Sequence, residues 1–77
     1  MKQLVYDLVV FLHLVDYHDS RMKMLTAMYN NELELEPDAL VNIVDSITDD
    51  LKDKKRDVAL INCVDEYKER IITESNY

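Results

Sequence analysis

The chain is short and acidic, which narrows the classes of protein to which it can belong. It has 77 residues, of which 48% are hydrophobic and 32% are charged, a balance typical of one small folded domain. Nine basic and 16 acidic side chains give a net charge of -7, which argues against direct binding to nucleic acid phosphates or anionic membranes. The single cysteine excludes an intrachain disulfide, and the absence of glycine excludes a glycine-rich phosphate-binding loop.

Residues 1–30 are predicted to be helical because their apolar side chains recur at alternating steps of four and three. The series is Leu4, Leu8, Phe11, Val15, His18, Met22, Leu25 and Tyr29. It predicts either one long helix or two helices in phase. In the second case the break is expected near 16–20. Asp19 or Ser20 would then cap the second helix. A β-strand at the start of the chain, favoured by its valines, is the alternative.

A stop and a linker follow the first helical segment. Asn30 and Asn31 tolerate the left-handed conformation that ends helices, and 32–36 alternates acidic and apolar residues, so we predict an extended linker over 31–36. Pro37 suits the first turn of a helix, because its missing N–H group has no partner to lose at that position.

Two further helices are predicted, over 37–52 and over 55–73, because each range carries a stripe of apolar residues at helical spacing. The charged run 49–57 is expected to hold a turn between them, and one continuous helix is the alternative. We therefore predict an all-α fold for the single domain 1–77. It would be a helical hairpin or a three-helix bundle with a long N-terminal helix, and dimeric.

The dimer is predicted because the first helix carries more apolar surface than one face can bury. A chain of 77 residues has too little other mass to cover a helix on all sides. Self-association is expected through the apolar residues on its flank and far side. These are Val5, Tyr6, Val9, Val10 and Leu12. The far-side stripe continues as Tyr17, Met24 and Met28, which we predict to contact a partner protein, since methionine repacks easily.

The net charge is confined to 32–53, which holds eight acids and one lysine. In a helix, four of these acids lie on one side, opposite the apolar stripe. They are Asp38, Asp45, Asp49 and Asp53. Two interpretations stay open: a docking surface for a basic partner, or the solvated outer face of an amphipathic helix.

Candidate catalytic chemistry is sparse. His13, Asp16, His18 and Asp19 have the side chains of metal ligands, but the two imidazoles would diverge on a straight helix, so we predict no metal site and no cofactor. Cys63 is expected to be a small buried hydrophobe, with a reactive thiol as the alternative.

One short segment resembles part of a known motif. The run Glu66-Tyr67-Lys68-Glu69 is similar to half of the motif of all-helical nucleotide pyrophosphatases. The other half is missing. The resemblance keeps a small helical metal-dependent nucleotide hydrolase as an alternative function.

The function predicted from the sequence is regulation by stoichiometric binding to another protein, as an inhibitor or adaptor and not as an enzyme. In size, acidity and lack of catalytic motifs the chain is similar to small helical accessory proteins of bacteriophages, which inhibit or redirect one host or phage protein. A DNA mimic that inhibits a nucleic-acid-binding protein is a further alternative. Because Asp7 interrupts the first apolar run and no cleavage site follows it, we expect no membrane insertion and a cytoplasmic location.

Overall fold

The computed structural model describes residues 2–75, and within them every element of regular secondary structure is an α-helix. The all-α prediction is therefore confirmed, and the β-strand alternative for the first residues is wrong. Within this range there are four helices, which is one more than a three-helix bundle and matches the alternative in which the first helical segment is broken near 16–20. They are α1 (Lys2–Leu14), α2 (Ser20–Tyr29), α3 (Pro37–Asp53) and α4 (Val58–Ser75).

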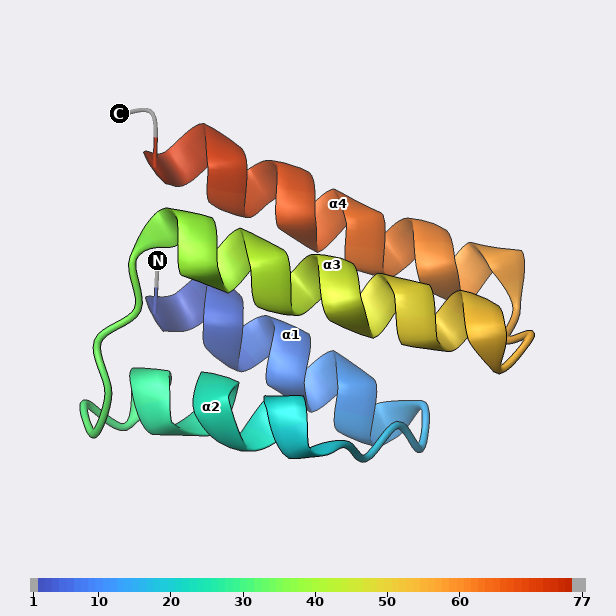
Figure 1. Ribbon diagram of the computed structural model, residues 1–77, viewed down its shortest axis with the longest axis horizontal. Coiled ribbons are helices and arrows are strands. Elements are labelled where there is room, and N and C mark those ends of the chain that lie inside the picture. The colour runs from blue at the N-terminus through green and yellow to red at the C-terminus, as the bar shows by residue number, and fades with distance from the viewer. Residues whose placement is uncertain (1, 76–77) are drawn as a thin grey trace.

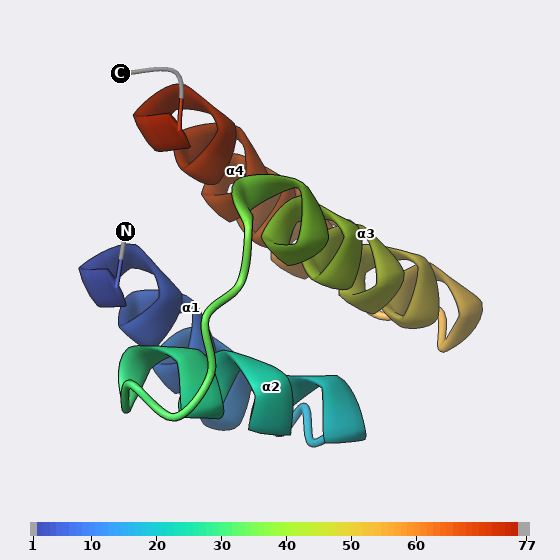
Figure 2. The same ribbon diagram turned by 60° about the vertical axis from the view of Figure 1, so that its left-hand side comes forward.

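The four helices form two antiparallel hairpins that pack against each other (Figure 1). α1 pairs with α2 and α3 pairs with α4, while α1 also contacts α4 and α2 contacts α3. The extended segment 31–36 joins the hairpins at one end, and Figure 2 shows it crossing from the end of α2 to the start of α3. The reversals within the hairpins both lie at the opposite end.

The predicted long helix over 1–30 is two helices, because the chain reverses after Leu14. The amide of Tyr17 donates to the carbonyl of Leu12 over 2.9 Å, and the amide of Asp16 donates to the carbonyl of His13 over 3.1 Å. Asp16 has a positive φ of 60°. Together these features are the Schellman motif that ends helices. Asp19 then caps α2, since its Oδ1 accepts a hydrogen bond of 2.9 Å from the amide of Arg21.

The same Schellman motif ends α2 and α3. Asn31 has a φ of 65° and Lys55 a φ of 55°. The amide of Glu32 donates to the carbonyl of Ala27 over 2.8 Å, and that of Arg56 to the carbonyl of Leu51 over 3.0 Å. Because the chain has no glycine, residues with a Cβ occupy all these left-handed positions, where asparagine and aspartate are tolerated better than lysine.

The second hairpin has a short turn at 54–57, which separates α3 from α4 and excludes one continuous helix. Pro37 is the first residue of α3. Asp57 precedes α4, and its Oδ1 accepts a hydrogen bond of 2.9 Å from the amide of Ala59. α3 and α4 each extend slightly beyond the C-terminal ends predicted for them, Asp53 against 52 and Ser75 against 73.

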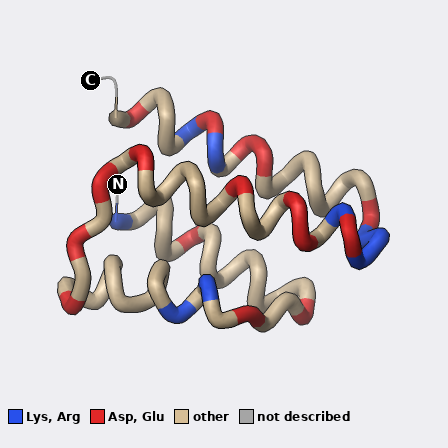
Figure 3. Tube along the Cα trace, in the orientation of Figure 1, with Lys and Arg blue, Asp and Glu red and all other residues tan. Residues whose placement is uncertain are grey.

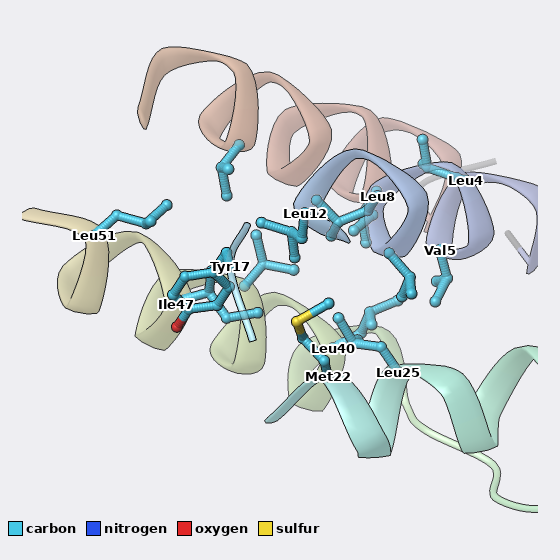
Figure 4. Close-up of a cluster of buried hydrophobic side chains, with 14 of the residues drawn as sticks. Leu4, Val5, Leu8, Leu12, Tyr17, Met22, Leu25, Leu40, Ile47 and Leu51 are labelled. Carbon is cyan, nitrogen blue, oxygen red and sulfur yellow. The ribbon is translucent and has the colours of Figure 1, made fainter. Parts of the chain in front are cut away.

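One apolar core lies between the hairpins and receives side chains from all four helices (Figure 4). Val5 and Leu12 of α1 lie in the same cluster as Leu25 of α2 and Leu40 of α3. Each fully buried aliphatic side chain of this size contributes about 1.5–3 kcal/mol relative to an exposed one. The core residues are Leu4, Val5, Leu8, Val9, Leu12, Tyr17, Met22, Leu25, Met28, Leu40, Val44, Ile47, Leu51, Leu60, Ile61, Val64 and Ile71.

The left-handed position at Lys55 yields a stability prediction. Lys55→Gly removes the Cβ that crowds this conformation, and we expect the free energy of unfolding to rise by about 0.5–1 kcal/mol. Asp53→Gly is the control, because this exposed residue lies inside α3, where glycine costs about 1 kcal/mol. Urea unfolding followed by circular dichroism measures both. A Lys55→Gly variant as destabilised as the control would contradict this account of the turn.

Candidate protein-interaction surface

The residues predicted to mediate self-association divide into two groups. Val5, Val9 and Leu12 lie in the core of the single chain, so a second copy could reach them only if the hairpins separated. The reason is the reversal after Leu14, which folds α2 back onto α1 and covers the flank that the sequence left without a neighbour. Tyr6 and Val10 remain on the surface, with exposed fractions of 46% and 39%.

These two residues belong to an apolar strip that the structure extends by one residue. Leu14, the last residue of α1, is 80% exposed and follows Tyr6 and Val10 at steps of four, so the three share one face of the helix. The aromatic rings of Phe11 and Tyr67 adjoin the strip, with their centroids 5.9 Å apart. We call the face formed by Tyr6, Val10, Phe11, Leu14 and Tyr67 the α1 contact surface.

The α1 contact surface is not flat. A hollow of about 330 Å³ lies between α1 and α4, and its lining is formed by Tyr6, Asp7, Val10, Phe11, Leu14 and Tyr67. The ring of Tyr6 is held from the other side by an edge-to-face contact with Tyr29 of α2, at 5.2 Å between centroids. Exposed apolar residues that gather beside a hollow are typical of contact sites for other proteins.

The sequence reasoning missed Leu14 and Tyr67 as members of this surface. It followed the far-side stripe from Val10 to Tyr17, which is correct for a helix that continues to residue 30. Because α1 ends at Leu14, Tyr17 turns inward and is only 1% exposed. Met28 is also buried, so of the three residues predicted to extend the stripe toward a partner only Met24 is exposed.

The four predicted aspartates of α3 differ in their surroundings (Figure 3). Asp38, Asp49 and Asp53 are exposed, and none has an ion-pair partner within residues 2–75. Asp45 is half-buried and accepts a hydrogen bond of 3.0 Å from Lys68 of α4, which raises the pKa of that lysine. Three exposed carboxylates without an ion-pair partner among the described residues therefore remain on α3.

A different aspartate, Asp50, is the centre of a polar network between the hairpins. Its Oδ2 accepts a hydrogen bond of 2.8 Å from the Tyr17 hydroxyl and lies 2.9 Å from Lys54 Nζ. Arg21, which pairs with Asp19 at 3.1 Å, is 3.9 Å from the same oxygen. A guanidinium N–H of Arg56 also donates to the carbonyl of Val15 over 2.6 Å. These contacts join the reversal at 15–19 to the end of α3.

The network shifts the pKa values of its members. Lys54, by its hydrogen bond, and then the Tyr17 hydroxyl lower the pKa of Asp50. Burial, followed by the hydrogen bond to Asp50, raises the pKa of Tyr17 above its ordinary range, so the hydroxyl stays protonated and donates. Nothing in the sequence distinguished Asp50 from Asp49, because only the position of Tyr17 in space selects between them.

The metal-ligand side chains predicted to diverge lie closer together than expected. The reversal brings the rings of His13 and His18 to 5.2 Å between centroids, beside a cavity of about 520 Å³ that also contacts Asp19, Lys23 and Glu32. Across residues 2–75 no three His, Cys, Asp or Glu side chains are grouped so that they could hold a metal ion. Cys63 is half-buried. No helix in the same range is long and apolar enough to cross a membrane.

Removing the Tyr17 hydroxyl tests the contribution of the network. We expect Tyr17→Phe to lower the free energy of unfolding by about 1 kcal/mol, because Asp50 loses one hydrogen bond while the ring stays buried. Tyr29→Phe is the matched control, since no hydrogen bond of its hydroxyl occurs among the described residues. Equal stability of Tyr17→Phe and the wild-type chain in urea unfolding would show that the network adds nothing to the fold.

The lowered pKa of Asp50 makes stability depend on acid pH. The folded state holds this carboxylate ionised to a lower pH than the unfolded state does, so its contribution is present above about pH 4 and is lost as the pH falls below that value. We expect the stability advantage of the wild-type chain over Asp50→Asn to shrink as the pH falls from about 6 to about 2. Thermal unfolding across that range measures it, with Asp49→Asn as the unpaired control. An advantage that stays constant with pH would contradict the assignment.

Comparison with known proteins supplies no relative for this chain. Neither the family models, nor the curated proteins, nor the solved structures that were searched contain a match. Functional inference therefore depends on the surfaces described above.

Proposed function

We propose that this protein is a small acidic regulator that acts by binding another protein stoichiometrically, as an inhibitor or an adaptor. The observation that supports this proposal best is the α1 contact surface, where three of the exposed large hydrophobic side chains of residues 2–75, Tyr6, Val10 and Leu14, lie in line on one helix. Burial of such a strip against a partner is favourable, whereas its exposure to water is costly. The proposal includes self-association through this surface, a cytoplasmic location, and no catalytic step or cofactor.

The aspartates of α3 have a second role in the proposal, which is to attract and orient a basic partner. Asp49 and Asp53 are one helical turn apart and exposed, and Asp38 is exposed at the other end of the helix. Unpaired surface charges of this kind raise the rate of association and favour partners of opposite charge more than they add to affinity. The apolar strip would supply buried contact area, and where the dimer occupies that strip, the carboxylates of α3 would make the contact with the partner.

The binding itself is tested by capture. The tagged chain is incubated with a lysate of the source organism, with and without nuclease, at low and high salt, and the bound proteins are identified by mass spectrometry. We expect one protein in stoichiometric amount that resists nuclease. A contact based mainly on buried apolar surface persists at high salt, whereas binding by a DNA mimic falls steeply with ionic strength. Recovery of no protein partner under any condition would contradict the proposal.

Charge reversal on α3 separates a docking surface from a solvated face. We expect Asp49→Lys combined with Asp53→Lys to leave the fold intact, since both side chains are exposed, and to weaken capture of the partner about tenfold or more. Glu66→Lys combined with Glu69→Lys is the control, because it changes the net charge equally on exposed residues of α4. If both double variants bind alike, the aspartates of α3 serve solubility only.

A further inference from the structure

We propose that the α1 contact surface binds the same surface of a second copy of this chain, and that Leu14 of each copy enters the hollow of the other. This inference rests on the proposed function for one premise, that the α1 contact surface is buried in a protein complex. It adds the arrangement of the two chains and the side chain that each inserts into the other.

The surface carries both parts of a self-complementary contact. Leu14 projects from the end of α1 and is 80% exposed, which makes it one of the most exposed large hydrophobic side chains in residues 2–75. The hollow of about 330 Å³ adjoins it on the same face, between α1 and α4. A contact between two identical patches related by a two-fold axis requires each patch to offer both a projecting group and a place that receives it. This face meets that requirement.

The spacing of the strip sets the register of the two chains. Tyr6, Val10 and Leu14 form a ridge of residues four apart, and two such ridges pack with a crossing angle of about -50°. In an antiparallel pair the two-fold axis passes beside Val10, so Val10 faces Val10 of the second copy. Leu14 and Tyr6 each lie about 6 Å from Val10 along the helix. Leu14 of one copy therefore meets the other at the level of Tyr6, beside the hollow.

The distribution of charge favours α1 over α3 as the face through which two copies meet. Residues 1–31 carry three basic and three acidic side chains and have no net charge, whereas 32–53 carries the whole charge of -7. Two copies that met through α3 would bring several like charges together, which costs free energy, while two copies that meet through α1 bring only Asp7 of each chain to the contact. The dimer leaves both α3 faces outside the contact, where a basic partner can reach them.

Sedimentation velocity over a concentration series tests the dimer. We expect the wild-type chain to be dimeric and Leu14→Glu to raise the dissociation constant at least about a hundredfold, because a charge would enter an apolar hollow. Leu14 is exposed within one chain, so the variant should fold, and circular dichroism checks this. Val58→Glu is the matched control. Val58 is 68% exposed at the start of α4 and does not line the hollow, so this variant should dimerise like the wild-type chain.

A cross-link tests the register independently. In a Cys63→Ser background, Val10→Cys should form a covalent dimer when a mild oxidant is added, since the two thiols would face each other across the two-fold axis. Val58→Cys in the same background should not. Comparable cross-linking of both variants would overturn the proposed arrangement.

Each remaining outcome decides either the dimer or the proposed function. A wild-type chain that stays monomeric up to about a hundred micromolar overturns the dimer, as does a dimer that Leu14→Glu leaves unchanged. A monomer that loses its captured protein partner on Leu14→Glu overturns the dimer and supports the proposed function. A Leu14-dependent dimer that captures no partner supports the inference and contradicts the regulatory function.

Discussion

The reversal of the chain between Leu14 and Ser20 is the constraint on which the other features of this molecule depend. The hydrogen bond from the amide of Tyr17 to the carbonyl of Leu12 ends α1, and Asp19 caps the start of α2. As a result α2 runs back along α1. Once α2 lies there, the flank of α1 that carries Val5 and Val9 is covered, and one core can form between two hairpins. A continuous helix over the same residues would leave that flank in water.

The buried ring of Tyr17 links this reversal to the second hairpin. The Tyr17 hydroxyl donates a hydrogen bond to Asp50, and the carboxylate of Asp50 also forms ion pairs with Lys54 and Arg21. Arg56 adds a contact to the carbonyl of Val15 from the turn between α3 and α4. Polar groups that would be expensive to bury alone are therefore paired at the end where both reversals meet, and the pairing orients one hairpin on the other.

The surface left after folding has two parts of different chemistry. The α1 contact surface is mainly apolar, with Asp7 as the charged residue that lines its hollow, and α3 presents Asp38, Asp49 and Asp53 to solvent. Apolar surface gains free energy by burial, whereas exposed carboxylates act over a longer range and choose among partners by charge. The proposed dimer and the proposed binding of a basic partner use these two parts separately, so one protein can do both at once.

The sequence alone determined the helical class and most of the core, because apolar residues at steps of three and four specify a helix face whatever it packs against. The stop at Asn31, the start at Pro37 and the confinement of charge to 32–53 are equally local and could be read directly. Tertiary structure decided which apolar residues stay exposed. Tyr17, Met28 and Val9 are as apolar as Tyr6, Val10 and Leu14, and only the path of α2 separates buried from exposed. Tertiary structure also decided that Asp50, and not Asp49, accepts the hydrogen bond from the Tyr17 hydroxyl. The two residues of this bond are 33 positions apart, so it depends on how the hairpins meet.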